Sequence, residues 1–551
     1  MAETEYPPID PTHFDLIVVG TGLPESTIAA AASTAGKSVL HLDPNPHYGS
    51  HYSSLSLNDL TSFLNPNPIN PNTHIQPSDH TTTTAINIIT RPLYTDVEIC
   101  CYDESVVECS RKFSLDLVGP RVLFCADVAV DVLLRSGGNQ YVEFKNVDGS
   151  YVWDGDRNGE LVSVPDSKSA VFKDRTLKFS EKNQLNSFFK LVQGHLEGVR
   201  GGGDGDGKVI SDEDLDSPFV AFLEKMKLPP KIKSIILYAI AMVDYDQDAG
   251  ESCKDVLKTR DGIDRLALYH SSVGRFPNAL GALIYPIYGQ GELPQAFCRR
   301  AAVKGCLYVL RMPVISVLLN KDTGDYKGVK LGSGQEITSN KLVMDPSFTI
   351  TSSPSESVQD VSKVFSSRGV SGKLARGICI TNSSIKPDKS SCLVIYPPRS
   401  LYPDQATSIR VLQVGSSLAV CPSGMFVFYI SVVCDNALEG KKALHAVIDG
   451  LFSVHTSGTA ESSSTDQTES TEVKPTLLWS ALYMQDVIEG SMGPVVMTPT
   501  PDGNLNYNEL LHTTLKLFQK LYPDDEFFPE IGNTDSSDKL EDDSEGGIES
   551  L

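Results

Sequence analysis

The sequence lacks the features that would connect it to metals, membranes or nucleic acids. Its eleven cysteines contain no CxxC pair and no His/Cys spacing that would arrange four ligands around a metal, so we expect reduced thiols and no metal site. The longest apolar run, Ile235 to Val243, spans nine residues, whereas a membrane-spanning helix needs about 20. The formal net charge of −23 would repel nucleic-acid phosphates. We therefore expect a soluble, cytosolic protein that binds no nucleic acid.

The chain is long enough for several domains, and its pattern changes along its length. Of its 551 residues, 40% are hydrophobic, which permits a large buried core. Strand-like and helix-like periodicities alternate with segments of low complexity. We expect a large α/β domain in three parts, 1–177, 283–452 and 475–530, with a helical domain inserted at 178–282. The expected additions are a loop insert at 63–84, a Gly/Asp insert at 198–207, a low-complexity linker at 453–474 and a disordered acidic tail at 531–551.

The N-terminal region has the pattern of a βαβ unit that binds dinucleotides. An apolar strand leads to Gly20 and Gly22, an Ala-rich helix follows, and a second strand ends at Asp43. The spacing from the glycines to Asp43 is close to that of the acid that binds a ribose hydroxyl. The third fingerprint position, where a glycine normally lies, is Glu25. We call Gly20, Gly22, Glu25 and Asp43 a degenerate fingerprint.

Glu25 is the reason to expect no cofactor. A carboxylate in the first helical turn would lie where the helix N-terminus holds a pyrophosphate. Two unit charges about 4 Å apart repel by about 4 kcal/mol at an effective dielectric constant near 20. The alternative is that Glu25 is simply a favourable first-turn helix residue, which also implies no cofactor.

Two long segments resemble the family of Rab GDP dissociation inhibitors and Rab escort proteins. The first contains GTGLPES at 20–26 and DPNPHYGSHYSSL at 43–55. The second is YPIYGQGELPQAFCRRAAVKGCLYVLRMPV at 285–314. Weaker similarity covers 115–153, 235–243 and 477–529. The resemblance implies an α/β fold with an FAD/NAD-binding-like, Rossmann-type large domain and an inserted, smaller, all-helical domain.

The resemblance also implies a surface that binds Rab GTPases in their GDP form. This platform is carried over residue by residue and comprises Tyr48, Gln290, Glu292, Gln295, Arg299 and Tyr308. Arginine and tyrosine suit a polar protein interface. The alternative is that Glu292 and Arg299 simply pair along a helix. In the family the helical domain shelters the geranylgeranyl lipid; the segment Ile235 to Val243 is a candidate cavity wall or, alternatively, a plain core helix.

Several features favour the escort branch of this family. Gln290 stands where the dissociation inhibitors have Leu, the first block has GLPES where they have GLTEC, and the inserts and acidic tail lengthen the chain. The branch implies a non-catalytic protein that binds unprenylated Rab, presents it to the Rab geranylgeranyltransferase α/β heterodimer and delivers the lipidated product to a membrane. The alternatives are a Rab GDP dissociation inhibitor and, more distantly, a flavin-dependent oxidoreductase.

Overall fold

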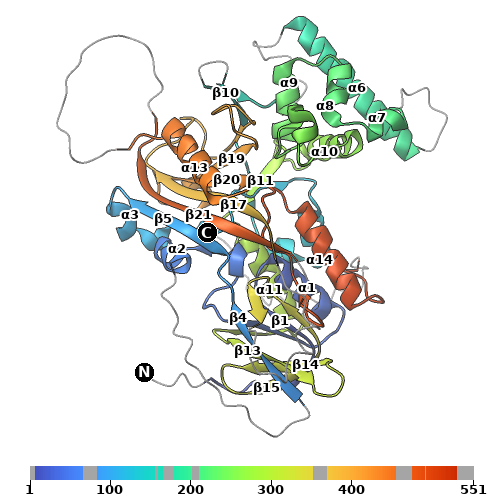
Figure 1. Cartoon of the computed structure of the whole chain (residues 1–551), viewed down its shortest axis with the longest axis vertical. Helices are drawn as coiled ribbons and strands as arrows, with labels where there is room; N and C mark the ends of the chain where they lie inside the picture. Colours follow the sequence, from blue (N-terminus) through green and yellow to red (C-terminus); the bar gives the residue numbers. More distant parts are fainter. Residues whose placement is uncertain are drawn as a thin grey trace, which may run out of the picture.

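The computed structural model describes residues 6–65, 83–155, 159–165, 178–201, 210–350, 369–454, 474–489 and 492–529. Two large sheets occupy the body of the molecule, and a group of helices lies at one end (Figure 1). The inserts, linker and tail expected at 63–84, 198–207, 453–474 and 531–551 lie wholly or mostly outside the described residues. In the described part, no helix combines the length and apolarity needed to cross a membrane.

The chain begins with the parallel βαβ unit that the glycine turn predicted. Its elements are β1 (His13–Val19), α1 (Leu23–Thr34) and β2 (Val39–Asp43). Gly20 makes the turn with a φ of +100°, and a Cβ at this position would lie 2.6 Å from the Cβ of Asp345. Only glycine fits such a backbone and such a close approach. Alanines fill α1, which is buried along nearly its whole length against α11 (Glu292–Val303) and α14 (Asn508–Leu521).

The first sheet has nine strands, and β1 and β2 belong to its parallel part. The strand order is β12-β2-β1-β15-β14-β13-β4-β16, with β22 beside β15. β12, β2, β1 and β15 run parallel to one another, so their carboxyl ends meet at one edge. The remaining strands are β12 (Leu307–Leu310), β15 (Glu336–Met344), β14 (Tyr326–Leu331), β13 (Val314–Asn320), β4 (Thr83–Thr90), β16 (Phe348–Ile350) and β22 (Val496–Met497).

The second sheet has eight strands, mostly antiparallel, in the order β10-β9-β18-β19-β20-β17-β21-β5. Helix α13 (Ala437–Leu451) packs on one face of this sheet (Figure 1). Every residue of β18 and β19 is buried, because both faces of the central strands are covered. The strands are β10 (Glu160–Ser163), β9 (Ser150–Asp154), β18 (Cys392–Tyr396), β19 (Ile409–Gly415), β20 (Phe426–Cys434), β17 (Gly369–Thr381), β21 (Leu477–Glu489) and β5 (Tyr94–Cys101).

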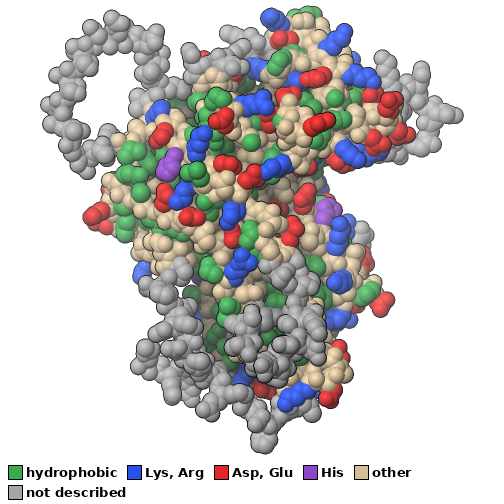
Figure 2. Space-filling view, viewed as in Figure 1, with side chains coloured by type: hydrophobic (Ala, Val, Ile, Leu, Met, Phe, Trp, Pro, Cys, Tyr) green, Lys and Arg blue, Asp and Glu red, His purple; other side chains and the backbone are tan. Residues whose placement is uncertain are grey.

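The helical group lies beyond the second sheet (Figure 1). Acidic side chains gather at its outer tip, where α7 carries the sequence DEDLD (Figure 2). A π-helical segment, η5 (Ile235–Ile240), is completely buried inside the group. The helices are α6 (Phe179–Gly201), α7 (Asp212–Asp216), α8 (Phe219–Lys225), α9 (Pro230–Ser234) and α10 (Thr259–Ser272).

Smaller elements connect these parts. A three-stranded sheet has the order β7-β11-β8, and β3 pairs with β6 in a short ladder. These elements are β7 (Leu123–Phe124), β11 (Leu283–Pro286), β8 (Phe144–Asn146), β3 (Ser54–Leu55), β6 (Leu115–Asp116), α2 (Leu57–Leu64), α3 (Ser105–Glu108) and α4 (Val128–Ser136).

A buried arginine makes one of several contacts between the helical group and the second sheet. Arg410, on β19, donates hydrogen bonds to the carbonyl oxygens of Gly503 (2.8 Å) and Met242 (2.7 Å). Its guanidinium also lies 2.8 Å from the carboxylate of Asp244, and its side chain is only 2% exposed. Arg410 therefore joins three segments that are far apart in the sequence.

Replacing Arg410 should loosen this junction. We expect Arg410→Met to lower the free energy of unfolding by about 3 kcal/mol, because the two carbonyl oxygens and the partly buried carboxylate of Asp244 would all lose their donor. Chemical denaturation measures this loss. The matched control is Lys254→Met: Lys254 pairs with Asp435 between the helical group and the end of β20, but the two side chains are 54% and 59% exposed, so a loss below about 1 kcal/mol is expected. Equal losses in both variants would contradict the special role of Arg410.

Candidate functional site: a filled fingerprint and a polar helix face

The carboxylate of Asp43, at the end of β2, is saturated by donors from its own chain. Its Oδ2 accepts hydrogen bonds from the Thr21 amide (2.9 Å), the Thr21 hydroxyl (2.6 Å) and the Ser50 hydroxyl (2.9 Å). Its Oδ1 accepts one from the Asn45 amide (2.8 Å). An acid at this place in a dinucleotide-binding fold would bond a ribose. Here it ties the loop that follows β2 onto the glycine turn.

Glu25 fills the space beside that turn. Its side chain is buried and accepts a hydrogen bond from the Thr498 hydroxyl. The carboxyl group folds back over Gly22, where a Cβ would lie only 2.4 Å from Oε2 of Glu25. This is the position from which a helix N-terminus would otherwise bind a phosphate.

The expectation that Glu25 carries a negative charge is wrong. Burial, reinforced by the nearby Asp345, raises the pKa of Glu25 to about 8, so the group is mostly protonated at neutral pH. Repulsion between Glu25 and a pyrophosphate therefore does not oppose pyrophosphate binding here. The obstacle is the volume that the carboxyl group and its partner Thr498 fill.

A buried contact between His51 and Asp345 closes the remaining side of the fingerprint. His51 Nε2 lies 3.2 Å from Oδ1 of Asp345, which follows β15, and both side chains are buried. Burial alone would raise the pKa of Asp345, but His51 and the hydrogen bonds from Ser347 hold it below its usual value. With Asp43 saturated and Glu25 in place, the residues at the fingerprint do not fit a dinucleotide.

The predicted platform residues on α11 lie along one side of that helix. Glu292, Gln295 and Arg299 follow a spacing of three and four residues, which places them on one face. Arg299 is exposed, whereas Glu292 and Gln295 are half-buried. The Gln295 amide lies 3.4 Å from Oε1 of Glu292, and the Arg299 guanidinium lies 6.0 Å from the centre of the Tyr141 ring.

The alternative reading of this face, a Glu292 and Arg299 ion pair, is not what the structure shows. Both residues belong to the described part, and no contact within 4 Å joins their charged groups there. Burial raises the pKa of Glu292, and the field of Arg299 partly opposes the rise. Neither charge is thus paired with the other: Glu292 accepts a hydrogen bond from Gln295, and Arg299 lies over the Tyr141 ring.

Tyr48 lies next to α11, on the loop that Asp43 holds. It is half-buried, and its ring meets that of Tyr308 edge-on with 5.9 Å between the centres. Tyr308 is half-buried and its hydroxyl is buried, so only part of its ring is accessible to a partner protein. Tyr48 and the face of α11 therefore form a surface of mixed polarity, and Tyr308 supports it from below.

Gln290 was predicted to belong to the platform surface, and the structure corrects this prediction. Only 1% of this residue is exposed. Its amide nitrogen donates to the carbonyl oxygen of Arg121 (2.8 Å), and its amide oxygen accepts from the Tyr507 hydroxyl (2.8 Å). Both ends of the side chain are thus used internally, and Gln290 positions the start of α11 without reaching its surface.

The sequence analysis missed the residues that hold the loop before α11. Asp116 accepts hydrogen bonds from the amide of Gln290 (2.9 Å), the hydroxyl of Ser54 (2.6 Å) and the hydroxyl of Tyr285. Burial raises the pKa of Asp116 to about 6, despite these donors. The one local signal was an acid within the apolar run LDLV at 115–118.

A family model supplies the deciding comparison. The model described as GDP dissociation inhibitor matches residues 10–83 and 72–470, which is most of the chain. The chain belongs to the GDP dissociation inhibitor family. The predicted family is thereby confirmed, and so is the α/β class.

Relatives within the GDP dissociation inhibitor family cover nearly the whole chain. Rab escort protein 1 of Arabidopsis thaliana is 53% identical over 99% of this chain and 98% of its own length. A Drosophila melanogaster protein named Rab proteins geranylgeranyltransferase component A is 29% identical over 94% of this chain and 90% of its own. The crystal structure of Rab GDI from Plasmodium falciparum has the same fold, with a TM-score of 0.66 at 20% identity, covering 93% of this chain and 98% of that one.

The raised pKa of Glu25 predicts a dependence of stability on pH. The folded state favours the protonated carboxyl, so this stabilisation is complete below the unfolded pKa of about 4.5 and is lost as pH rises through about 8. Relative to Glu25→Gln, the wild-type free energy of unfolding should fall by about 3 kcal/mol between pH 6 and 9.

Denaturant titrations at several pH values measure this difference. Glu336→Gln, at an exposed position of β15, is the matched control and should parallel the wild type. If Glu25→Gln also parallels the wild type, Glu25 is ionised in the folded protein and the assignment above fails.

Proposed function

We propose that this chain is an escort for Rab GTPases. It binds an unprenylated, GDP-bound Rab, presents it to the α/β heterodimer of Rab geranylgeranyltransferase, and carries the lipidated product to a membrane. It acts in the cytosol as a non-catalytic accessory protein. The observation that carries the proposal is the 53% identity with a Rab escort protein over nearly the full length of both chains.

The surface formed by Tyr48 and α11 is the proposed client platform. Arg299 is exposed on it and offers a planar guanidinium that can bond a carboxylate through two hydrogen bonds. Tyr48 adds a large ring with a polar tip, a combination common at the centre of protein interfaces. Glu292 supplies carboxylate acceptors, and the side-chain amide of Gln295 supplies both an acceptor and a donor.

The geranylgeranyl group of the client would add affinity after lipid transfer. Each CH₂ group taken from water contributes about 0.8 kcal/mol, so even partial burial prolongs the complex. The candidate wall at Ile235 to Val243 is packed, with no residue more than 7% exposed. In this conformation the segment is part of the core, and a lipid would enter beside it only after the surrounding helices separate.

The first experiment is a reconstituted prenylation assay. Geranylgeranyl transfer to an unprenylated Rab by the purified heterodimer should require this protein. Arg299→Ala should raise the half-maximal concentration at least tenfold, because truncating a central interface arginine costs about 2 kcal/mol. Lys516→Ala, which removes one positive charge from an exposed position of α14, should behave as the wild type.

The assay also separates the alternatives. A dissociation inhibitor would extract prenylated Rab from membranes without supporting transfer, and transfer that proceeds equally without the protein would favour that function. A flavin-dependent oxidoreductase would carry a flavin with an absorbance near 450 nm. The packing of Glu25 and Asp43 predicts that this absorbance is missing from the purified protein.

A further inference from the structure

The last described segment after α14 passes behind the proposed client platform. This C-terminal strap, Tyr522 to Phe528, ends with Phe528, which is only 1% exposed. The Phe528 ring stacks on that of Phe297, with 6.2 Å between the ring centres and 29° between the planes. Phe297 belongs to α11 and is itself buried. The strap therefore touches the same helix that carries Glu292 and Arg299.

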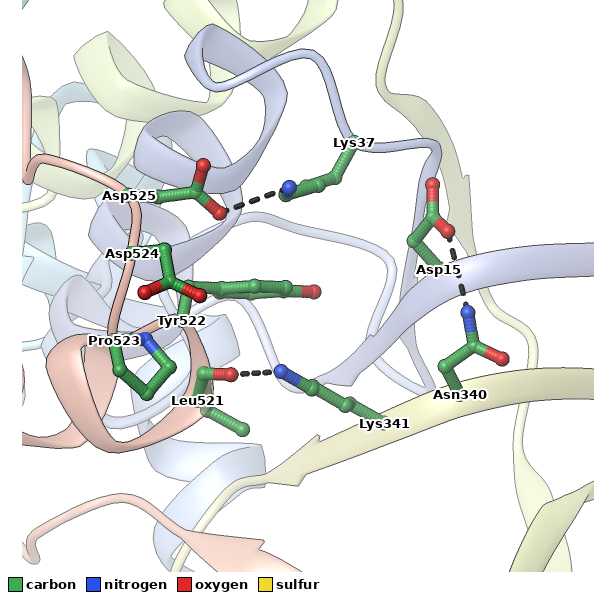
Figure 3. A pocket seen from close by; sticks show the side chains of 9 residues that line it. All are labelled: Asp15, Lys37, Asn340, Lys341, Leu521, Tyr522, Pro523, Asp524 and Asp525. Carbon is green, nitrogen blue, oxygen red and sulfur yellow. Dashed lines mark hydrogen bonds and ion pairs between the residues drawn. The ribbon is translucent and has the colours of Figure 1, made fainter.

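The other end of the strap is clamped to the first sheet. The Tyr522 ring lies between two lysines (Figure 3), with Nζ of Lys341 3.9 Å and Nζ of Lys37 5.3 Å from its centre. Lys341 also donates to the carbonyl oxygen of Leu521, and Lys37 pairs with Asp525 at 2.9 Å. Cations over an aromatic face attract it, so this clamp fixes where the strap begins.

The backbone of Phe528 indicates that its ring is held under constraint. Its φ is +52°, a left-handed conformation that aromatic residues seldom adopt. Such a conformation persists where surrounding packing determines it. Here the determining contacts are the rings of Phe297 and Phe527, the latter 4.9 Å away between centres.

We propose that the C-terminal strap is a positioning element of the client platform, and that Phe528 sets the place of α11 through Phe297. The proposal rests on the proposed function. Phe528 contacts no client; it acts through the helix whose outer face presents Glu292, Gln295 and Arg299. Because those three groups move together with α11, a small shift of its inner face changes all of them at once.

The test compares Phe528→Ala with the wild type by calorimetric titration of GDP-loaded, unprenylated Rab, at a temperature where both proteins are folded. We expect about tenfold weaker binding, equivalent to about 1.4 kcal/mol, with unchanged stoichiometry. In the prenylation assay the half-maximal concentration should rise while the saturating rate stays the same. Phe528→Leu, which keeps apolar bulk against Phe297, should recover most of the affinity.

The matched control is Phe452→Ala. Phe452 is 4% exposed, and its ring meets that of Phe428 with 4.9 Å between the centres, in a core cluster separate from the one that holds Phe297 and Phe528. This variant removes similar apolar bulk away from α11 and should bind Rab within about twofold of the wild type. If Phe452→Ala weakens binding as much as Phe528→Ala, the effect is general destabilisation and the proposal is overturned.

Two further outcomes separate this proposal from the proposed function. A lower stoichiometry with an unchanged dissociation constant would mean that Phe528 only stabilises the fold, which overturns the positioning role. If the wild type binds no Rab, the proposed function itself fails. Hydrogen exchange in the free protein then tests the mechanical link: faster exchange of α11 amides in Phe528→Ala is the expected result, and unchanged exchange overturns it.

Discussion

The buried carboxylate of Asp43 is the contact on which the candidate site depends. Four hydrogen bonds converge on it from the glycine turn and from the loop after β2. A carboxylate removed from water is stable only when its lone pairs are satisfied. The loop therefore cannot leave without exposing a costly acceptor. Tyr48 lies on this loop, so its place in the proposed client platform depends on the residue that matches the acid of a dinucleotide fingerprint.

A second set of buried polar contacts connects the separate parts of the molecule. Gln290, just before α11, bonds the carbonyl oxygen of Arg121, whose guanidinium in turn bonds the loop at Asp502. Arg410 holds the next residue, Gly503, and reaches the helical group. The Nε atoms of Arg121 and Arg410 are buried without hydrogen-bond partners, so these links depend on the terminal nitrogens of the two guanidinium groups. The proposed platform and the helical group are thus joined through one C-terminal loop.

Local patterns predicted the local parts of this structure, and long-range contacts account for the errors. The βαβ unit follows from an apolar run, a glycine turn and an Ala-rich helix, all within about 30 residues of one another. Nothing near Glu25 indicates Thr498 or Asp345, so its protonation was missed. Gln290 was assigned to a surface for a similar reason, since the sequence does not reveal that Arg121 and Tyr507 enclose its amide.

The way in which this fold fills its fingerprint changes how its stability is controlled. A protein that binds a free cofactor gains stability in proportion to the logarithm of the cofactor concentration. Here the groups that fill the space, Glu25 and Thr498, are joined covalently to the rest of the chain. Their local concentration is fixed by the sequence and does not respond to metabolism. The packing beside the glycine turn therefore forms together with the fold and adds no concentration-dependent term to its stability.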